Sequence, residues 1–506
     1  MNIAAVIESH PADKPAVIDA LDQMTYGDLR HASASFRGGL LEAGMTRGDR
    51  VAIICGNTFQ FVVGYLAVVG AGMVAVPLNP LSPAPELERE LRAIGARGAI
   101  VGPMGSAAVL ASHASDLPDL DLLVGCPGVD LGQRGTHTFE TMLEGPPAPV
   151  VDVDDDTVAV LMFTSGTAGL PKAAMLTHAN LEVNHRQAIA HAPEGFLPDD
   201  IAYGVLPLFH IFGLNSVLGL SLKVGATVLL AQRFDPESLA DAVEHQGVTI
   251  VVGPPTMWLA LATLPDSHLG AFAKVRMAMS GAAKLPDHVA ELVANRLKLH
   301  LDEGYGLTEA APGLLSSLGT DAPRGSVGRP LPGVEMRVVD AEGDDVLIGD
   351  AGEIIARGPN IFPGYWNDAE ATRRALDEDG WLHTGDIAVV DDNGNISIID
   401  RAKDLIIVSG FNVFPAEVET VLLTHPLVAG AAVTGVSHPH TDEAVKAFVV
   451  LVDDSDGAVA GPGFEEEELI AFCRTQLAAY KCPVKVDVVE ALPTGLGGKI
   501  RRRELG

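Results

Sequence analysis

Short apolar segments alternate with helix-like segments along most of the chain, and this alternation is the strongest constraint on its fold. Residues 50–55 and 158–163 have the composition of buried strands. A helix-like segment over residues 236–245 precedes a strand-like segment over residues 249–252. Continuous apolar strands separated by helices are typical of sheets that helices cover on both faces. The pattern therefore predicts an α/β protein with layered, buried sheets.

One uncharged stretch is long enough to raise the question of a membrane span. Residues 51–85 contain no charged side chain, and residues 59–78 are largely apolar. Gly64, Gly70 and Gly72 interrupt residues 59–78, and a short β-prone segment that ends at Pro77 follows them. We interpret it as a buried helix followed by a buried strand, and we expect no transmembrane segment. A transient association with a membrane stays open.

The second half of the chain has more β-prone segments, and its pattern of segments indicates a domain boundary near residue 400. Residues 391–395 have the composition of a hairpin turn, and they lie between the strand-like segments 387–390 and 396–399. The section that follows has its own helices and strands and the length of a small α+β domain. We therefore predict an N-terminal domain over residues 1–400 and a C-terminal domain over residues 401–506.

Charge and cysteine usage exclude several classes of partner. The chain has 34 basic and 66 acidic residues, a formal net charge of −32, so we expect no nucleic-acid partner. Its four cysteines form no CxxC pair, and their spacing suggests neither a disulfide framework nor a zinc site. The N-terminus lacks a basic segment followed by an apolar one, so we expect no signal peptide. A cytoplasmic location is the resulting prediction, and a homodimer stays open.

A glycine-rich segment directly follows the predicted strand at 158–163. It reads Thr164-Ser165-Gly166-Thr167-Ala168-Gly169-Leu170-Pro171-Lys172. Glycines allow backbone N–H groups to turn toward an anion, while hydroxyls and a lysine add donors and positive charge. The spacing is not that of the P-loop. By itself the segment is as compatible with a surface loop as with phosphate binding.

Four further motifs contain residues whose side chains are suited to catalysis or ligand binding. In Gly304-Tyr305-Gly306-Leu307-Thr308-Glu309, the tyrosine can stack on a base and Glu309 is a hard oxygen ligand suited to Mg²⁺. The second of these motifs is His383-Thr384-Gly385-Asp386. The third is Asp400-Arg401-Ala402-Lys403-Asp404, which the segment 409–419 follows. The fourth is the segment 492–503, in which Lys499 follows two glycines. Singly, the first two are better explained as a structural turn and a polar loop, and the structural alternatives for the other two are a charged linker and a basic tail.

In this order and spacing, the five motifs resemble those of the adenylate-forming superfamily. That superfamily includes acyl- and aryl-CoA ligases, luciferases and peptide-synthetase adenylation domains. The resemblance runs from Thr25-Tyr26 to Lys499, nearly the whole chain. It implies a large N-terminal domain of layered α/β sheets plus a distorted β-barrel, and a small, mobile α+β C-terminal domain that rotates between two half-reactions. It also implies ATP, Mg²⁺ and, as a co-substrate, coenzyme A.

By motif match, the resemblance assigns roles to individual residues. Those of the phosphate loop would be Thr164, Ser165, Gly166, Thr167 and Lys172. Those along the nucleotide and acyl pocket would be Gly281, Ala282 and Ala283. Those around ATP would be Tyr305 on adenine, Thr308 on phosphate, Glu309 on Mg²⁺, and Asp386 on the ribose with Arg401 nearby.

The C-terminal section receives three roles from the same resemblance. Lys403 matches the hinge, and Gly410 would border the path of the thiol. Lys499 matches the lysine that bridges the acyl carboxylate and the α-phosphate. A carboxylate that attacks ATP meets like-charge repulsion, which Mg²⁺ and Lys499 would offset. A lysine on a moving domain can withdraw after adenylation.

The chain departs from the family pattern at a few positions. Ala168 stands where threonine is usual, and Ala173 stands where glycine is usual. Neither change removes a charge, so we expect function to be retained. Lys499 follows a Gly-Leu-Gly-Gly sequence instead of the commoner Thr-Gly form. We expect the extra glycine to loosen the placement of this lysine.

The segment 206–216 resembles the one that gates the acyl pocket of fatty-acyl and aryl-CoA ligases. A largely apolar pocket is expected from His210, Phe212, Ser216, Gly281, Gly306 and Pro312, and His210 is also expected to act in the reaction. The segment has no aspartate to hold an α-amine, and no carrier domain follows Lys499, which favours CoA as the acceptor.

The identity of the acid is less constrained than the reaction. The small residues Ala282, Ala283 and Gly313 leave space for a longer chain, so we favour a medium- or long-chain fatty acid. A coumarate-like aryl acid is the alternative. A luciferase-like oxygenase and a catalytically weak nucleotide-binding homologue stay open as hypotheses of other classes.

Overall fold

A seven-stranded sheet forms the first part of the chain in the computed structural model. The model describes residues 1–19, 22–113, 117, 119–164, 172–401, 404–408, 411–438, 442–452, 466–477, 479–494 and 500–505. The strands run in the order β7-β6-β5-β3-β4-β8-β9. They are β3 (Arg50–Ile54), β4 (Val74–Pro77), β5 (Gly98–Val101), β6 (Leu122–Gly125), β7 (His137–Thr138), β8 (Val158–Thr164) and β9 (Lys172–Thr177). All neighbours are parallel except β8 and β9, which pair antiparallel.

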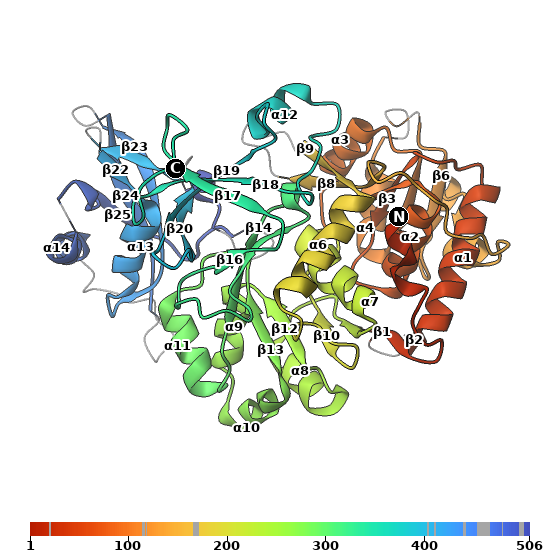
Figure 1. Ribbon diagram of the computed structural model, residues 1–506, viewed down its shortest axis with the longest axis horizontal. Coiled ribbons are helices and arrows are strands. Elements are labelled where there is room, and N and C mark those ends of the chain that lie inside the picture. The colour runs from red at the N-terminus through yellow and green to blue at the C-terminus, as the bar shows by residue number, and fades with distance from the viewer. Residues whose placement is uncertain are drawn as a thin grey trace.

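Helices cover both faces of this sheet, as the alternation of apolar segments predicts (Figure 1). The helices are α1 (Tyr26–Glu42), α2 (Phe59–Gly70), α3 (Ala84–Ile94), α4 (Pro103–Ala111), α5 (Phe139–Leu143) and α6 (His178–His191). Val51 and Ile53 of β3 pack in one cluster with α1 and α2, while Ala52 and Ile54 pack in another with α3 and α4. Successive strand residues point to opposite faces, so a continuous apolar strand fills two cores.

The uncharged stretch at residues 51–85 is therefore the interior of this sheet. It forms β3, α2 and β4, and most of its side chains are buried. Among the described residues, no helix combines the length and apolar character that crossing a bilayer requires. The interpretation as a buried helix and strand is confirmed.

A nine-stranded sheet forms the middle of the chain, in the order β16-β15-β14-β13-β12-β10-β11-β1-β2. The strands are β1 (Pro15–Asp19), β2 (Asp22–Thr25), β10 (Ile201–Gly204), β11 (Thr227–Leu230), β12 (Ile250–Gly253), β13 (Met277–Ser280), β14 (Asp302–Gly306), β15 (Gly313–Ser316) and β16 (Arg329–Pro330). The helical elements around it are η4 (Phe212–Gly219), α7 (Leu220–Val224), α8 (Pro236–Asp241), η5 (Ala242–Gln246), α9 (Pro255–Ala262), α10 (Asp266–Leu269), η6 (Gly270–Lys274) and α11 (Asp287–Arg296). Of these, η4 and η5 are π-helical.

The last third of the chain contains two smaller sheets. One is antiparallel and comprises β17 (Glu335–Val339), β18 (Gly352–Arg357), β19 (Leu382–Val390) and β20 (Ile396–Arg401), with α12 (Ala369–Ala375) beside it. Its strands pair in the order β17-β18-β19-β20, and an isolated bridge between Ile396 and Gly328 connects β20 to the chain next to β16. The turn predicted at residues 391–395 connects β19 to β20.

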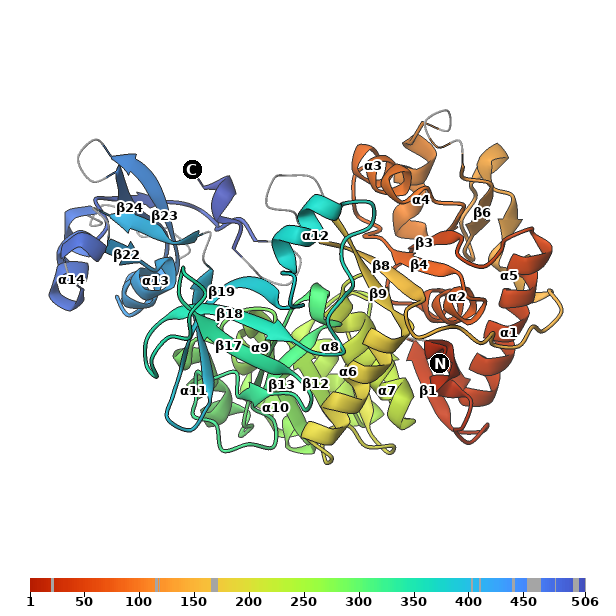
Figure 2. The same cartoon turned by 45° about the horizontal axis from the view of Figure 1, so that its top comes forward.

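The other small sheet has a hydrophobic core of its own. Its elements are β21 (Ile406–Val408), β22 (Phe411–Val413), α13 (Pro415–Leu423), β23 (Val428–His438), β24 (Asp442–Leu451), α14 (Glu466–Gln476) and β25 (Lys485–Val488). Every buried residue of its core cluster comes from positions 406–486. In Figures 1 and 2 this sheet lies at one end of the molecule, beside β17–β20 and far from the seven-stranded sheet.

All four cysteines are buried and unpaired by disulfides. The Sγ atom of Cys55 lies 3.6 Å from the Sγ atom of Cys126, beside the seven-stranded sheet. Cys473 and Cys482 belong to the core cluster of the C-terminal sheet. The absence of a disulfide framework, expected from the cysteine spacing, is confirmed.

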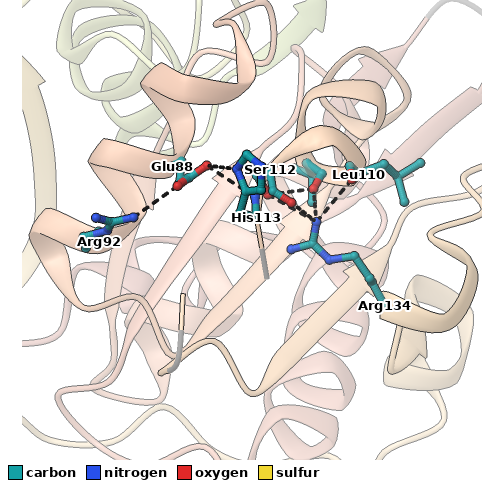
Figure 3. A network of polar contacts seen from close by, with 7 residues as sticks. Glu88, Arg92, Leu110, Ser112, His113 and Arg134 are labelled. Atoms are coloured by element: carbon teal, nitrogen blue, oxygen red, sulfur yellow. Dashed lines mark hydrogen bonds and ion pairs between the residues drawn. The ribbon is translucent and has the colours of Figure 1, made fainter. Parts of the chain in front are cut away.

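An arginine closes the end of helix α4 (Figure 3). The Nη1 atom of Arg134 donates to the backbone oxygen of Ser112 at 3.0 Å and to its Oγ atom at 3.2 Å. On the neighbouring helix α3, Glu88 accepts from Arg92 at 3.1 Å and lies 3.4 Å from Nδ1 of His113. A cation at a helix C-terminus satisfies orphan carbonyls and opposes the helix dipole. None of the predicted site residues belongs to this network.

Asn57 joins the seven-stranded sheet to the nine-stranded sheet. The residue follows β3, and its buried Nδ2 atom donates to the backbone oxygens of Gly204 at 2.9 Å and Leu206 at 3.0 Å. Its Oδ1 atom accepts from the backbone N–H of Leu208 at 3.0 Å. One side chain therefore holds the segment that leads from β10 to His210 against the end of β3.

We expect Asn57→Ala to lower the stability by about 3 kcal/mol, because it leaves several buried backbone groups without partners. The drop in melting temperature measures this loss, and amide hydrogen exchange at residues 206–208 should rise. Asn393→Ala, an exposed turn position, is the matched control and should change neither quantity. Equal behaviour of the two variants would contradict the role assigned to Asn57.

Candidate active site

The glycine-rich segment connects the two strands of an antiparallel hairpin. Thr164 at the end of β8 pairs directly with Lys172 at the start of β9, and both are half-buried. The expected strand before the loop is confirmed, and the return strand β9 was not predicted. The loop residues Ser165, Gly166 and Thr167 lie outside the described residues. The hairpin places the two described ends of the predicted phosphate loop side by side.

A tight turn between β14 and β15 contains four of the predicted site residues. A Cβ atom on Gly306 would lie 2.0 Å from the backbone oxygen of Pro312, so only glycine fits there. The backbone N–H of Leu307 donates to the same oxygen at 3.0 Å. Thr308 and Glu309 occupy the single turn of 3-10 helix η7 (Thr308–Ala310) inside this loop. The structure therefore brings Gly306, Thr308, Glu309 and Pro312 together.

Tyr305 of β14 contacts Asp386 of β19. The phenol hydroxyl donates to Oδ2 of Asp386 at 2.6 Å, and Asp386 is buried, with 4% of its surface exposed. In the antiparallel pair of β19 and β20, the residue directly opposite Asp386 is Arg401. Three residues predicted to surround the adenosine part of ATP therefore meet, although the Arg401 side chain lies outside the described part.

Gly281, Ala282 and Ala283 follow β13, which is the parallel neighbour of β14. An ideal Cβ on Gly281 would lie 3.6 Å from the backbone oxygen of Gly304, so this turn runs beside the Tyr305 strand. Ala282 has φ of +68°, a left-handed conformation that costs about 1–2 kcal/mol in a residue other than glycine. Strain of this kind, at the carboxyl ends of parallel strands, is typical of ligand sites.

The segment expected to gate the acyl pocket begins just before η4. The ring of Phe212 lies against Gly281, where a Cβ atom would come within 2.9 Å of the phenyl Cζ. The backbone N–H of Phe212 donates to Nδ1 of His210 at 3.2 Å. His210 retains an exposed surface, but the surrounding protein removes hydration and lowers its pKa. Because Nδ1 accepts this hydrogen bond, the neutral form of the imidazole carries its proton on Nε2.

Ser216 completes the described part of the predicted acyl pocket. It is half-buried in η4, one turn after Phe212. The neighbouring Asn215 donates from Nδ2 to the backbone oxygen of Ala311 at 2.7 Å. This bond connects η4 to the turn that carries Glu309.

Tyr365, which was not predicted as a site residue from the sequence, contacts two of the predicted residues. Its hydroxyl donates to Oε1 of Glu309 at 2.6 Å, and its ring centroid lies 5.2 Å from Nζ of Lys172. Burial, and next the Glu309 carboxylate, raise the pKa of Tyr365, so the phenol stays protonated. The aromatic pair Tyr365-Trp366, which follows Pro363-Gly364 between two predicted motifs, was the available signal.

The residues around Glu309 fit a magnesium ion that a nucleotide brings with it. In the described part of the chain, the Oε2 atom of Glu309 has no hydrogen bond or ion pair. Within the same residues, no group of three or more histidine, cysteine or carboxylate side chains could hold a metal. Mg²⁺ is commonly bound by one or two carboxylates together with substrate phosphates, which matches a single free carboxylate oxygen.

Three predicted residues of the C-terminal section, Lys403, Gly410 and Lys499, lie outside the described residues. Their roles as hinge, thiol path and catalytic lysine stay predictions.

Comparison with known proteins identifies the family. A model of AMP-binding enzymes matches residues 3–366, and a model of the AMP-binding enzyme C-terminal domain matches residues 417–499. A feruloyl-CoA synthase of Amycolatopsis sp is 38% identical over 484 residues, covering 95% of this chain and 93% of that protein. A long-chain-fatty-acid–CoA ligase of Escherichia coli O157:H7 is 34% identical, covering 98% and 91%.

A solved structure agrees with these relatives. ATP-bound MatB from Rhodopseudomonas palustris superposes with a TM-score of 0.89 at 30% identity, covering 100% of this chain and 98% of that one. The chain is an adenylate-forming enzyme, as the five motifs indicated. It belongs to the AMP-binding family, in the branch of acyl- and aryl-CoA ligases.

A buried histidine supports the π-helical segment η4 from α6. The Nε2 atom of His185 lies 3.1 Å from the backbone oxygen of Asn215, and its Nδ1 atom is buried without a partner. Burial is the main cause that lowers the pKa of His185 to about 4. Because the folded state holds this ring neutral while the unfolded chain protonates near pH 6.5, acid favours unfolding between these two values.

We therefore expect a pH-dependent gap between the wild type and His185→Gln. At pH 5.5 the neutral ring costs the wild type about 1.4 kcal/mol relative to neutral pH, and the glutamine variant is free of this cost. Melting temperatures of both proteins between pH 7.5 and 5.5 measure the difference. Parallel curves would show that His185 does not titrate in this range.

Proposed function

We propose that this enzyme is an ATP-dependent carboxylate–CoA ligase. It forms an acyl-adenylate with release of pyrophosphate, and then transfers the acyl group to coenzyme A. The observation that carries the proposal is the convergence of Lys172, Tyr305, Glu309 and Asp386 from three sheets, linked by two tyrosine–carboxylate hydrogen bonds of 2.6 Å. The relatives named as CoA synthases and ligases support the thiol acceptor.

In the first step, a carboxylate oxygen bonds to the α-phosphorus of ATP and the bond to pyrophosphate breaks. Tyr305 would stack on adenine while its hydroxyl stays with Asp386, which would orient the ribose. Thr308 and Lys172 would bind phosphate oxygens. Glu309 would hold Mg²⁺, which supplies positive charge where the phosphates accumulate negative charge. Lys499 would bring the acyl carboxylate and the α-phosphate together.

In the second step, the CoA sulfur bonds to the acyl carbon and AMP leaves. Rotation about Lys403 would withdraw Lys499 and open a path beside Gly410. All three residues are assigned from the family motifs alone. A separate core in the C-terminal sheet is the structural feature that supports independent movement of this part.

For the acid, we infer an aryl carboxylic acid. The Phe212 ring lies against Gly281, and we expect it to supply an aromatic wall of the acyl pocket. The 38% identity to a feruloyl-CoA synthase supports the same class. A medium- or long-chain fatty acid is the second candidate, supported by the small, exposed residues Ala282 and Ala283 and by the fatty-acid ligase relatives.

ATP–pyrophosphate exchange over a panel of aryl and fatty acids tests the activation step. We expect exchange with at least one class, and thioester formation only when CoA is added. No exchange with any acid would overturn the proposal and favour a weak nucleotide-binding homologue. Oxygen consumption without thioester formation would favour a luciferase-like oxygenase.

Lys499→Ala separates the two half-reactions. We expect it to abolish exchange and to spare thioester formation from supplied acyl-AMP, because only adenylation needs the bridging charge. Single-turnover rates of each step provide the measurement. Equal loss of both steps would contradict the rotating-domain account.

Phe212→Ala tests the assignment of the acid. We expect exchange with aryl acids to fall about tenfold, because the aromatic wall is lost, and exchange with long fatty acids to rise. The half-buried Phe234, which packs against the core of the nine-stranded sheet, supplies the control variant Phe234→Ala. The aryl assignment fails if Phe212→Ala changes the ratio between the two acid classes no more than Phe234→Ala does.

A further inference from the structure

The segment Asn360–Trp366 lies between the two parts of the candidate active site that carry opposite charge. On one side it extends the hairpin of Lys172. The backbone N–H of Trp366 donates to the oxygen of Ala173 at 2.8 Å, and that of Met175 donates to the oxygen of Gly364 at 3.0 Å. Tyr365 itself forms a β-bridge with Ala174.

On its other side, the same segment holds the turn that carries Glu309. The backbone N–H of Phe362 donates to the backbone oxygen of Glu309 at 2.8 Å. The Nδ2 atom of Asn360 donates to the oxygen of Ala310 at 2.8 Å. The segment therefore fixes the distance between the lysine of the hairpin and the carboxylate of the turn.

The conformation of Tyr365 is determined by packing before any ligand binds. Its backbone N–H donates to Oγ1 of Thr372 in α12 at 2.9 Å. Its ring meets the ring of Phe362 edge to face, with centroids 4.9 Å apart. Gly364 has φ of +139°, and a Cβ atom there would lie 2.5 Å from Cγ2 of Thr372. The close approach of α12 thus orients the tyrosine.

The chemistry of a phenol suits this place between a lysine and a carboxylate. Two opposite charges near one another attract, and a direct ion pair would neutralise the groups that an anionic nucleotide and its metal require. A neutral hydroxyl satisfies one oxygen of Glu309 without cancelling its charge. The ring attracts the Lys172 ammonium by a cation–π contact without an acidic partner.

We propose that Tyr365 is a positioning residue, whose hydroxyl orients the Glu309 carboxylate for Mg²⁺ and whose ring keeps Lys172 available for phosphate. The inference rests on the proposed ATP-dependent function of the site. Tyr365 acts through two other side chains, and it is the position where the cationic and anionic halves of the site are joined.

The test measures ATP binding by calorimetry at a series of Mg²⁺ concentrations, without acid or CoA. For Tyr365→Phe we expect the Mg²⁺ concentration at half-maximal enhancement of ATP binding to rise about tenfold, as loss of a hydrogen bond to a charged group predicts. ATP affinity without Mg²⁺ should stay within about twofold, because the ring remains under Lys172. Tyr365→Leu should weaken both.

Tyr26→Phe is the matched control. Its hydroxyl donates to the backbone oxygen of Ala226 at 2.7 Å in a buried position away from the predicted site residues, so its loss should lower stability and leave the Mg²⁺ dependence unchanged. A double-mutant cycle with Glu309→Gln distinguishes a positioning role of Tyr365 from a purely structural one, because a structural role would not couple the two residues in the Mg²⁺ dependence of ATP binding. Once Glu309 is neutral, Tyr365→Phe should produce no further change in Mg²⁺ dependence.

The outcomes separate this inference from the proposed function. If wild-type protein shows Mg²⁺-dependent ATP binding and Tyr365→Phe shows the same dependence, or if its effect adds fully to that of Glu309→Gln, the positioning role is overturned. If the wild type shows no Mg²⁺-dependent ATP binding, the proposed function itself fails. If Tyr365→Phe folds poorly, Thr372→Val replaces it as the test, because this variant loses the hydrogen bond to the Tyr365 backbone. We expect it to raise the Mg²⁺ concentration at half-maximal enhancement of ATP binding by a smaller factor, and no rise would overturn the positioning role.

Discussion

The hydrogen bonds that fix three sheets relative to one another are the constraint on which the candidate active site depends. Lys172 comes from the seven-stranded sheet, Tyr305 and Glu309 from the nine-stranded sheet, and Asp386 from the sheet of β17–β20. No single sheet holds the complete set. The Asn57 amide and the backbone of residues 362–366 connect the seven-stranded sheet to the nine-stranded sheet, so this part of the site's geometry is set by bonds outside the reacting groups.

The carboxylates of the two acidic residues of the site each accept a hydrogen bond from a tyrosine. Asp386 accepts from Tyr305 and Glu309 accepts from Tyr365, each at 2.6 Å. A phenol stabilises a carboxylate and leaves its negative charge in place. In a protein with a net charge of −32, this arrangement spares the few cations near the site for an anionic ligand.

Much of the fold and part of the site follow from local sequence patterns. Strand β3, helix α2 and strand β8 could be predicted because a short apolar segment between glycines and prolines is compatible with few other structures. The motif residues at 305–309 and 386 could be predicted from the family resemblance. The contacts of Tyr365 with Glu309 and of Phe212 with Gly281 could not be predicted from the sequence. They join residues far apart in the chain whose local sequence is compatible with many loops. The π-helical form of residues 212–219, whose Asn215 backbone oxygen contacts His185 of α6, likewise could not be predicted from the local sequence.

The burial of the four cysteines has a practical consequence. Cys55 and Cys126 lie in the seven-stranded part, whereas Cys473 and Cys482 lie in the core of the C-terminal sheet. The residues around each pair shield the thiols from a reagent in solution, so we expect opening of the surrounding structure to raise their labelling rate. The natural chain therefore carries an internal reporter in each part. Labelling followed by peptide mapping gives the opening free energy of the two parts separately, with no engineered probe.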